Sequence, residues 1–257
     1  MTTLDGLWNA PPADMAVSND EVHVWRASLD LAESEVQRLA QTLSADERTR
    51  SERFYFERDR QRFIAGRGML RQILGRYLGI DPSRLRFRYG AHGKPALAEP
   101  AGERGLRFNV SHSQGLALYA VTCNREVGVD LERVRPISNA DRIAERFFSS
   151  QENAALRALP ANLKCEGFFT CWTRKEAYIK ARGDGLSFSL DQFDVSLAPG
   201  APAALLDVRG HPQEVSRWSL LELIAGSGYV AALAVEGHHW RLKCWQWPEG
   251  GLYRLRN

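Results

Sequence analysis

Short stretches of alternating apolar and polar residues predict strands, and longer stretches with apolar residues three or four positions apart predict helices. Strands are expected at residues 22–27, 85–89, 106–110, 116–121, 126–132, 193–195, 218–223 and 228–235, with a final one within 240–247. Helices are expected at 29–43, at 138–148, at 168–180 and, as one or two helices, between 54 and 77. Ser44 and Ser149 each precede acidic residues, which is typical of a helix N-terminus.

The two parts of the chain resemble each other in this pattern. Each has a helix-rich segment, then strands, then an apolar strand that follows a glycine, at residues 115–121 and 228–235. We therefore expect an α+β fold of two similar halves, residues 1–125 and 126–257, joined near residues 124–127.

Length and composition narrow the class of protein. A chain of 257 residues with 44% hydrophobic residues can bury a large core. No apolar run reaches membrane-spanning length, and the first residues lack the layout of a secretory signal, so we expect a cytoplasmic protein. The four cysteines are scattered and lack the spacing of metal ligands, which favours free thiols.

Charge is concentrated in one segment. The net charge of +3 is too small to indicate nucleic-acid binding. Residues 48–71, however, contain eight arginines against three acids. This excess indicates an anionic ligand or partner, with a solvated helix face as the alternative.

The helix expected at 168–180 carries Trp172, Glu176 and Lys180 on one face, because these residues are four apart. Taken alone, Glu176 and Lys180 could form a surface ion pair of small energy. Asp130 and Glu132 also share a face, that of the strand at 126–132. Burying both carboxylates calls for a cation, and Mg²⁺ is the usual choice; an edge strand with solvated acids is the alternative.

Two polar segments could bind phosphate. Ser111 and His112 lie in a polar link that we expect between two strands, and Lys94 stands in a stiff Gly-Lys-Pro turn. Each of these could equally be structural. The sequence contains no P-loop, no G-x-G-x-x-G and no H-E-x-x-H pattern, which excludes the common nucleotide and zinc signatures.

These segments together resemble the Sfp-type 4′-phosphopantetheinyl transferases of the holo-acyl-carrier-protein synthase superfamily. The resemblance rests on residues 108–113 (FNVSHS), 128–132 (GVDLE) and 172–180 (WTRKEAYIK), in the family's order, and on the Gly-Lys-Pro turn. It covers roughly residues 44–235. It implies a monomer whose halves are related by a pseudo-twofold axis, with the active site in the cleft between them.

The implied reaction moves phosphopantetheine from coenzyme A to a serine of an apo carrier protein, in the presence of Mg²⁺, and releases 3′,5′-ADP. Asp130, Glu132 and Glu176 would surround the metal. Glu176, or a water on the metal, would take the serine proton, and Lys180 would neutralise or protonate the leaving oxygen. Asp130, Glu176 and Lys180 are thus the implied catalytic set. The implied phosphate and nucleotide contacts are Arg50, Lys94, Ser111, His112, Lys175 and Lys180, with Arg62, Arg53 and Arg67 as further contributors.

The chain departs from the family at Glu47, where relatives often carry a lysine, so one phosphate contact is missing or comes from Arg48. Phe147 and Phe148, with nearby arginines, would either dock the carrier or lie in the core. A catalytically silent coenzyme A or nucleotide-binding protein is the alternative function. Nucleic-acid binding through residues 48–71 is a third reading that the interleaved acids disfavour. The resemblance does not say which carrier is served.

Overall fold

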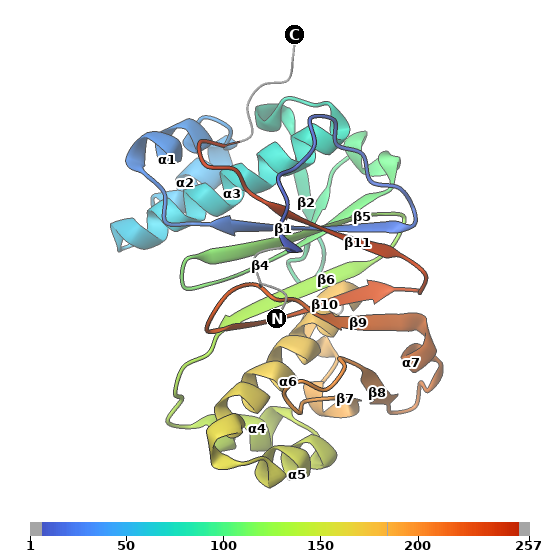
Figure 1. Cartoon of the computed structure of the whole chain (residues 1–257). Helices are drawn as coiled ribbons and strands as arrows, with labels where there is room; N and C mark the ends of the chain where they lie inside the picture. Colours follow the sequence, from blue (N-terminus) through green and yellow to red (C-terminus); the bar gives the residue numbers. More distant parts are fainter. Residues whose placement is uncertain (1–6, 184, 252–257) are drawn as a thin grey trace.

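Two long helices enclose two facing sheets, so the molecule has four layers (Figure 1). A computed structural model describes residues 7–183 and 185–251. Helix α3 (Glu57–Leu78) covers the outer face of the first sheet, and helix α6 (Ala161–Arg182) covers the outer face of the second. The α+β prediction is confirmed.

The first half begins with strand β1 (Glu21–Ser28), helix α1 (Glu33–Ala40) and helix α2 (Ala45–Ser51), which lead into α3. A short hairpin, β2 (Phe87–Tyr89) and β3 (Pro95–Leu97), and strands β4 (Leu106–Ser113) and β5 (Leu116–Cys123) follow. The sheet order is β11–β1–β5–β4, in which β11 (Arg241–Gln246), from the far end of the sequence, runs parallel to β1.

The second half repeats this plan. Strand β6 (Val127–Arg133) precedes helices α4 (Ala140–Phe147), α5 (Ser150–Ala158) and α6. A hairpin, β7 (Phe193–Val195) and β8 (Leu205–Val208), is followed by helix α7 (Gln213–Arg217) and strands β9 (Trp218–Glu222) and β10 (Tyr229–Glu236). The order β6–β10–β9 matches β1–β5–β4 element for element, as two similar halves require; the pseudo-twofold axis between them stays a prediction.

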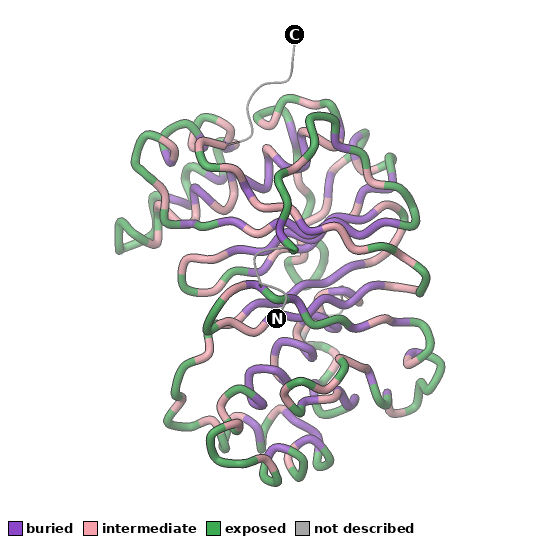
Figure 2. Tube along the Cα trace, viewed as in Figure 1, coloured by how far each residue is buried: buried purple, intermediate pink, exposed green. Residues whose placement is uncertain are grey.

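Strand alternation places the core. Odd-numbered residues of β1 and β5 face α3, whereas Val22, Val24, Leu118 and Ala120 face the other sheet. They meet Val127, Val129, Leu131, Ala231 and Leu233 of the second half, and the resulting layer is buried on both sides (Figure 2). Each such valine or leucine contributes about 1.5–3 kcal/mol on burial, so the two halves are held together by a continuous hydrophobic layer.

Helix ends follow the predicted signals. Ser44 and Ser149 both form capping boxes, with Glu47 and Glu152 respectively. Helix α6 ends where Gly183 adopts φ +81°, a left-handed conformation that favours glycine. One local prediction is wrong: Ser111 and His112 lie within β4, because the strand continues to Ser113, rather than in a link after it.

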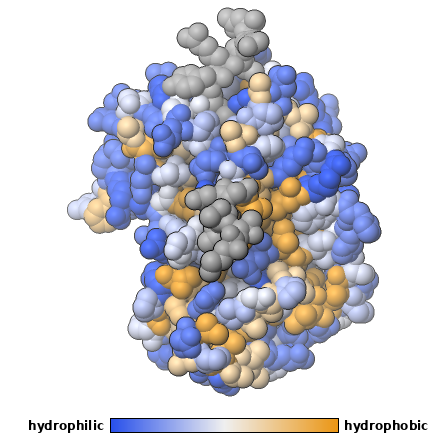
Figure 3. All heavy atoms as spheres, viewed as in Figure 1, coloured by the Kyte–Doolittle hydropathy of each residue, from blue (hydrophilic) through white to orange (hydrophobic). Residues whose placement is uncertain are grey.

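The face of the molecule seen in Figure 3 is mostly hydrophilic, with apolar patches near its middle and lower part. Tyr55 is 92% exposed and Phe56 63% exposed at the start of α3. No helix in residues 7–183 or 185–251 is long and apolar enough to cross a bilayer. The arm before β1 is partly built into the core, because Trp8 is buried between the two sheets.

Candidate active site

Strand β6, which carries Asp130 and Glu132, packs against helix α6 at Gly128, where the missing side chain allows close approach. Asp130 is buried and points to the α6 side, whereas Val129 and Leu131 point into the layer between the sheets, as the sequence predicted. Gly128 lies on the same side as Asp130. A Cβ at Gly128 would overlap the backbone of α6 at Ala177, so any larger residue would push the helix away.

Lys180 reaches from α6 to Asp130 and ties both halves together. Its Nζ lies 2.6 Å from Asp130 Oδ1 and 3.1 Å from the Ser111 hydroxyl on β4. The Ser111 hydroxyl in turn donates to Asp130 Oδ1 at 2.8 Å. Serine, aspartate and lysine from three elements therefore meet at one point between the halves.

The acids around this point influence one another. Burial raises the pKa of Glu176, and Asp130 and Glu132 raise it further, against the opposing effect of Lys180. Burial and Asp130 likewise raise the pKa of Glu132, while a hydrogen bond from Ser113 lowers it. Three carboxylates thus lie close together, and Lys180 alone does not balance their negative charge. A bound cation would reduce their mutual repulsion.

Asp130 has a free acceptor at this place. Its Oδ2 atom is buried and has no hydrogen-bond partner among the described residues. A buried oxygen of this kind is costly unless something binds it. Within the described ranges no three His, Cys, Asp or Glu side chains converge into a complete metal cage. This is compatible with Mg²⁺, which usually takes one or two carboxylates and completes its shell with water and phosphate oxygens.

A histidine and an arginine lie beside Ser111. His112 is the next residue of β4, and desolvation lowers the pKa of its imidazole, as do Lys180 and Arg62. Arg62 on α3 is held in place by Asp30, with Nε and Nη2 at 2.7 and 2.9 Å from the two carboxylate oxygens. The structure therefore brings His112 and Arg62 to the same end of β4.

Lys94 lies at the other end of the junction. Its Nζ donates to the Ala181 carbonyl at the end of α6 and to Glu126, both at 3.0 Å. Lys94 and Glu126 line a pocket of about 310 Å³ between the halves, together with Arg88, Arg107 and Phe108. The Gly-Lys-Pro turn thus connects the two halves through Lys94.

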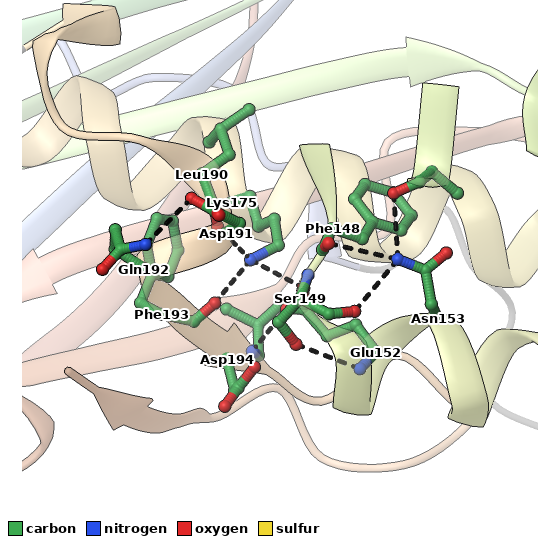
Figure 4. Close-up of polar contacts among 12 residues, drawn as sticks. Phe148, Ser149, Glu152, Asn153, Lys175, Leu190, Asp191, Gln192, Phe193 and Asp194 are labelled. Carbon is green, nitrogen blue, oxygen red and sulfur yellow. Dashed lines mark hydrogen bonds and ion pairs between the residues drawn. The ribbon is translucent and has the colours of Figure 1, made fainter. Parts of the chain in front are cut away.

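The structure corrects the predicted role of Lys175. The prediction that it holds a phosphate is wrong, because its side chain is fully buried on a different face of α6 from Lys180. Figure 4 shows its Nζ directed to Glu152 at 2.7 Å and to the carbonyls of Leu190 and Phe193. Glu152 also accepts the backbone N–H groups of Ser149 and Val195. Lys175 therefore fastens α6 to α5 and β7 and cannot reach a ligand in the cleft.

Several arginines of the basic segment also have structural partners. Arg67 and Arg71 both bind Glu47, which is buried, and Arg71 also donates to the carbonyls of Pro82 and Leu85. The excess of arginine thus partly serves the packing of α2 on α3, and Arg67 is not a free phosphate contact. Arg50 is exposed and its guanidinium lies over the ring of Phe63, 5.4 Å from the centroid.

Phe148 belongs to the core, which removes it from the docking hypothesis. It is 3% exposed and packs on Phe168. Phe147 is half-buried against Trp172, whose indole is stacked on Phe168. Trp172 therefore anchors α6 in the hydrophobic cluster that contains Phe148 and Phe168.

Comparisons with known proteins agree with this geometry. Residues 25–124 match the model "4′-phosphopantetheinyl transferase, N-terminal", and residues 126–234 match the model of the 4′-phosphopantetheinyl transferase superfamily. The 4′-phosphopantetheinyl transferase HetI of Nostoc sp. is 47% identical over 244 residues, which cover 95% of this chain and 100% of HetI. The chain belongs to the 4′-phosphopantetheinyl transferase superfamily.

Further relatives are more distant. The 4′-phosphopantetheinyl transferase Sfp of Bacillus subtilis is 34% identical over 167 residues, covering 65% of this chain and 72% of Sfp. Among solved structures, the holo-[acyl-carrier-protein] synthase of Thermotoga maritima matches with a TM-score of 0.33 and 20% identity, over 45% of this chain and 64% of that one. The chain is accordingly an enzyme, a 4′-phosphopantetheinyl transferase, and the junction of its two family segments falls between β5 and β6.

Proposed function

We propose that this phosphopantetheinyl transferase takes its group from coenzyme A and attaches it to a serine of an apo carrier protein. The observation that carries the proposal is the contact of Lys180, Asp130 and Ser111 between the halves, with Glu176 and Glu132 beside it. A cation-lined junction with acids at its centre fits a substrate rich in phosphate, and coenzyme A offers a pyrophosphate and a 3′-phosphate.

Asp130, Glu132 and Glu176 would hold Mg²⁺. The buried and unpartnered Oδ2 of Asp130 and the raised pKa values of both glutamates support this assignment. When bound, the ion would supply positive charge to the pyrophosphate as charge builds up on it.

Glu176 is our candidate for the base that takes the serine proton. Its carboxylate shares one face of α6 with Lys180 and lies close to Asp130, which supports a role as proton acceptor at the junction. As the serine oxygen bonds to the phosphorus on the pantetheine side, the bond from that phosphorus to the bridging oxygen breaks, and 3′,5′-ADP leaves. The serine proton passes to Glu176, and Lys180 neutralises the departing oxygen. Both residues act through position and charge, as in other phosphoryl transfers.

The remaining polar and basic residues would hold the nucleotide part. Ser111 and His112 present a hydroxyl and an imidazole beside Lys180, and Lys94 presents an ammonium at the opposite end of the junction. Arg62 and, at its exposed site over Phe63, Arg50 would contribute charge near the end of β4. We also propose a cytoplasmic location, since all four cysteines are free thiols. That the protein acts as a monomer rests on the family resemblance alone.

The test is transfer itself. The chain is incubated with coenzyme A, Mg²⁺ and several apo carriers, and the carriers are weighed intact by mass spectrometry. We expect a phosphopantetheine adduct. No adduct on any carrier, with coenzyme A still bound, would instead support a silent binding protein.

Glu176→Gln tests the base. Loss of a general base typically costs 10²–10⁴-fold in rate, so kcat should fall by about that factor while coenzyme A still binds. Glu166→Gln, at an exposed position of the same helix, is the matched control and should leave kcat unchanged. A fully active Glu176→Gln enzyme would exclude the proposed role.

A further inference from the structure

Strands β4 and β6 lie against each other at the junction without pairing through their backbones. Each is the edge strand of its own sheet, and they come from different halves. Alternate residues of an edge strand direct their N–H groups away from the neighbouring strand, and buried N–H groups need acceptors. The acceptors for β6 come from side chains of β4.

Three side chains on one face of β4 fill this need in succession. Asn109 Oδ1 accepts the Val129 N–H at 2.9 Å, and the Ser111 hydroxyl accepts the Leu131 N–H at 3.3 Å. The Ser113 hydroxyl accepts the Arg133 N–H at 3.2 Å. We call these three contacts the side-chain ladder. It matches alternate residues of β4 to alternate residues of β6, and so fixes the register between the halves.

The two serines of the side-chain ladder also bind the acids of β6. A hydroxyl can accept one hydrogen bond and donate another. Ser111 donates to Asp130 Oδ1, and Ser113 donates to Glu132 Oε2, each at 2.8 Å. Ser113 therefore binds Glu132 as Ser111 binds Asp130, and both serines also bind the backbone of β6.

We propose that Asn109 and Ser113 are positioning residues for the transfer reaction: they fix the register and orientation of the acidic strand toward Lys180. The inference rests on the proposed function, because it takes Asp130 and Glu132 as the carboxylates that must be oriented to hold Mg²⁺. Asn109 acts on the strand next to Asp130, and Ser113 acts on Glu132 directly. Residues that orient metal-binding carboxylates typically change metal affinity or activity by 10–100-fold when removed.

Ser113→Ala tests the orientation of Glu132. We expect kcat to fall about tenfold and the Mg²⁺ concentration for half-maximal rate to rise by a similar factor, with the KM for coenzyme A changed by less than about twofold. Direct Mg²⁺ binding, measured by calorimetry on the enzyme alone, should weaken in parallel. Ser113→Thr keeps the hydroxyl and should restore both values.

Ser216→Ala is the matched control, since the Ser216 hydroxyl bonds only locally to the Gln213 carbonyl in the described structure. It should alter neither kcat nor the response to Mg²⁺. If Ser113→Ala lowers the melting temperature but leaves both kcat of the folded enzyme and Mg²⁺ binding unchanged, Ser113 is merely structural and the inference is overturned. Failure of Ser113→Thr to restore activity would overturn it as well.

Amide exchange tests the side-chain ladder without reference to activity. In Asn109→Ala, the amide of Val129 should exchange roughly tenfold faster by NMR, while the amide of Leu233, on β10, should not change. Equal exchange rates of the Val129 amide in wild type and in Asn109→Ala would show that Asn109 does not fix the position of β6. If wild-type enzyme transfers nothing from coenzyme A but the exchange result holds, the proposed function fails while the side-chain ladder stands.

Discussion

Lys175 and Lys180 lie on the same helix, α6, and have opposite surroundings. Lys175 is fully buried against Glu152, whereas Lys180 is 29% exposed by its side chain and faces the cleft. Helical geometry explains the difference, because Lys175 precedes Glu176 by one position and so points about 100° away from it. Lys180 follows Glu176 by one turn and shares its face.

Replacing Lys175 by Met should destabilise the protein by about 3–5 kcal/mol, because the change leaves Glu152 buried without its cation. Denaturant unfolding followed by circular dichroism measures this. Lys164→Met, at an exposed position of the same helix, is the control and should change the free energy of unfolding by less than about 0.5 kcal/mol. Adding Glu152→Gln to Lys175→Met should recover part of the loss.

Glu21 is expected to make stability depend on pH at acid values. The Lys243 ammonium, 2.5 Å away, lowers the pKa of Glu21 to about 2 from an ordinary value of 4.5. The folded state therefore favours the charged form, so this contribution to stability is present above pH 4.5 and is lost as pH falls toward 2. Melting temperatures of wild type and Glu21→Gln should differ at pH 7 and converge near pH 2. A constant difference over that range would contradict the assignment.

At the scale of elements, close packing depends on glycine at particular positions. Gly68 of α3 lies against Leu39 of α1, with no room for a Cβ, whereas a Cβ at Gly66 would make ordinary contacts of 3.6 Å or more. Close approach of α1 therefore requires glycine at position 68 but not at position 66. Gly128 on β6 resembles Gly68, because α6 leaves it no space.

Gly128→Ala should therefore separate α6 from β6. Overpacking of this kind typically costs 1–3 kcal/mol, and the shift of Lys180 and Glu176 away from Asp130 should lower kcat by more than the stability loss explains. Unfolding and carrier modification measure the two effects. Gly66→Ala, where a Cβ would make only ordinary contacts, should instead stabilise by about 0.5–1 kcal/mol with unchanged kcat. Wild-type kcat in Gly128→Ala would show that the close approach is not needed.

The sequence predicted most elements because their patterns are local. The strand with Asp130 was found close to its true position, whereas β4 continues three residues beyond its predicted end and α6 begins seven residues before its predicted start. Strands β3 and β8 and helix α7 were missed, because short elements have too few residues to show a period. The burial of Lys175 depends on Glu152 and on β7, whose positions only the tertiary fold supplies. Asn109 and Ser113 did carry a signal, namely polar residues at alternate positions of a strand whose other face is apolar.

At the scale of the whole molecule, the two ends of the chain hold the halves together. Trp8 is buried between the sheets, donates from its indole to the Ile224 carbonyl at 2.7 Å and lies under Arg26. Asn9 pairs with β11, which in turn pairs with β1. These segments lie outside residues 44–235, which carry the family resemblance, so the resemblance implies no role for them.

Trp8→Ala should destabilise the protein by about 3–5 kcal/mol, as is usual for a buried tryptophan, and should raise the KM for coenzyme A because the halves are less firmly joined. Thermal unfolding and steady-state kinetics measure both. Leu7→Ala is the neighbouring control, since Leu7 is 47% exposed, and should change neither. A loss of stability without any change in KM would show that Trp8 stabilises the core without influencing the cleft.

The position of β11 has a consequence for how the chain is made. Strand β1 is synthesised well before its partner on one edge, β11, which follows all the other strands of the described residues. Until residues 241–246 emerge, that edge of β1 has unpaired backbone groups that can pair with another chain. The first half therefore completes its sheet only after the second half has been synthesised. We expect the two halves to reach their final folds together.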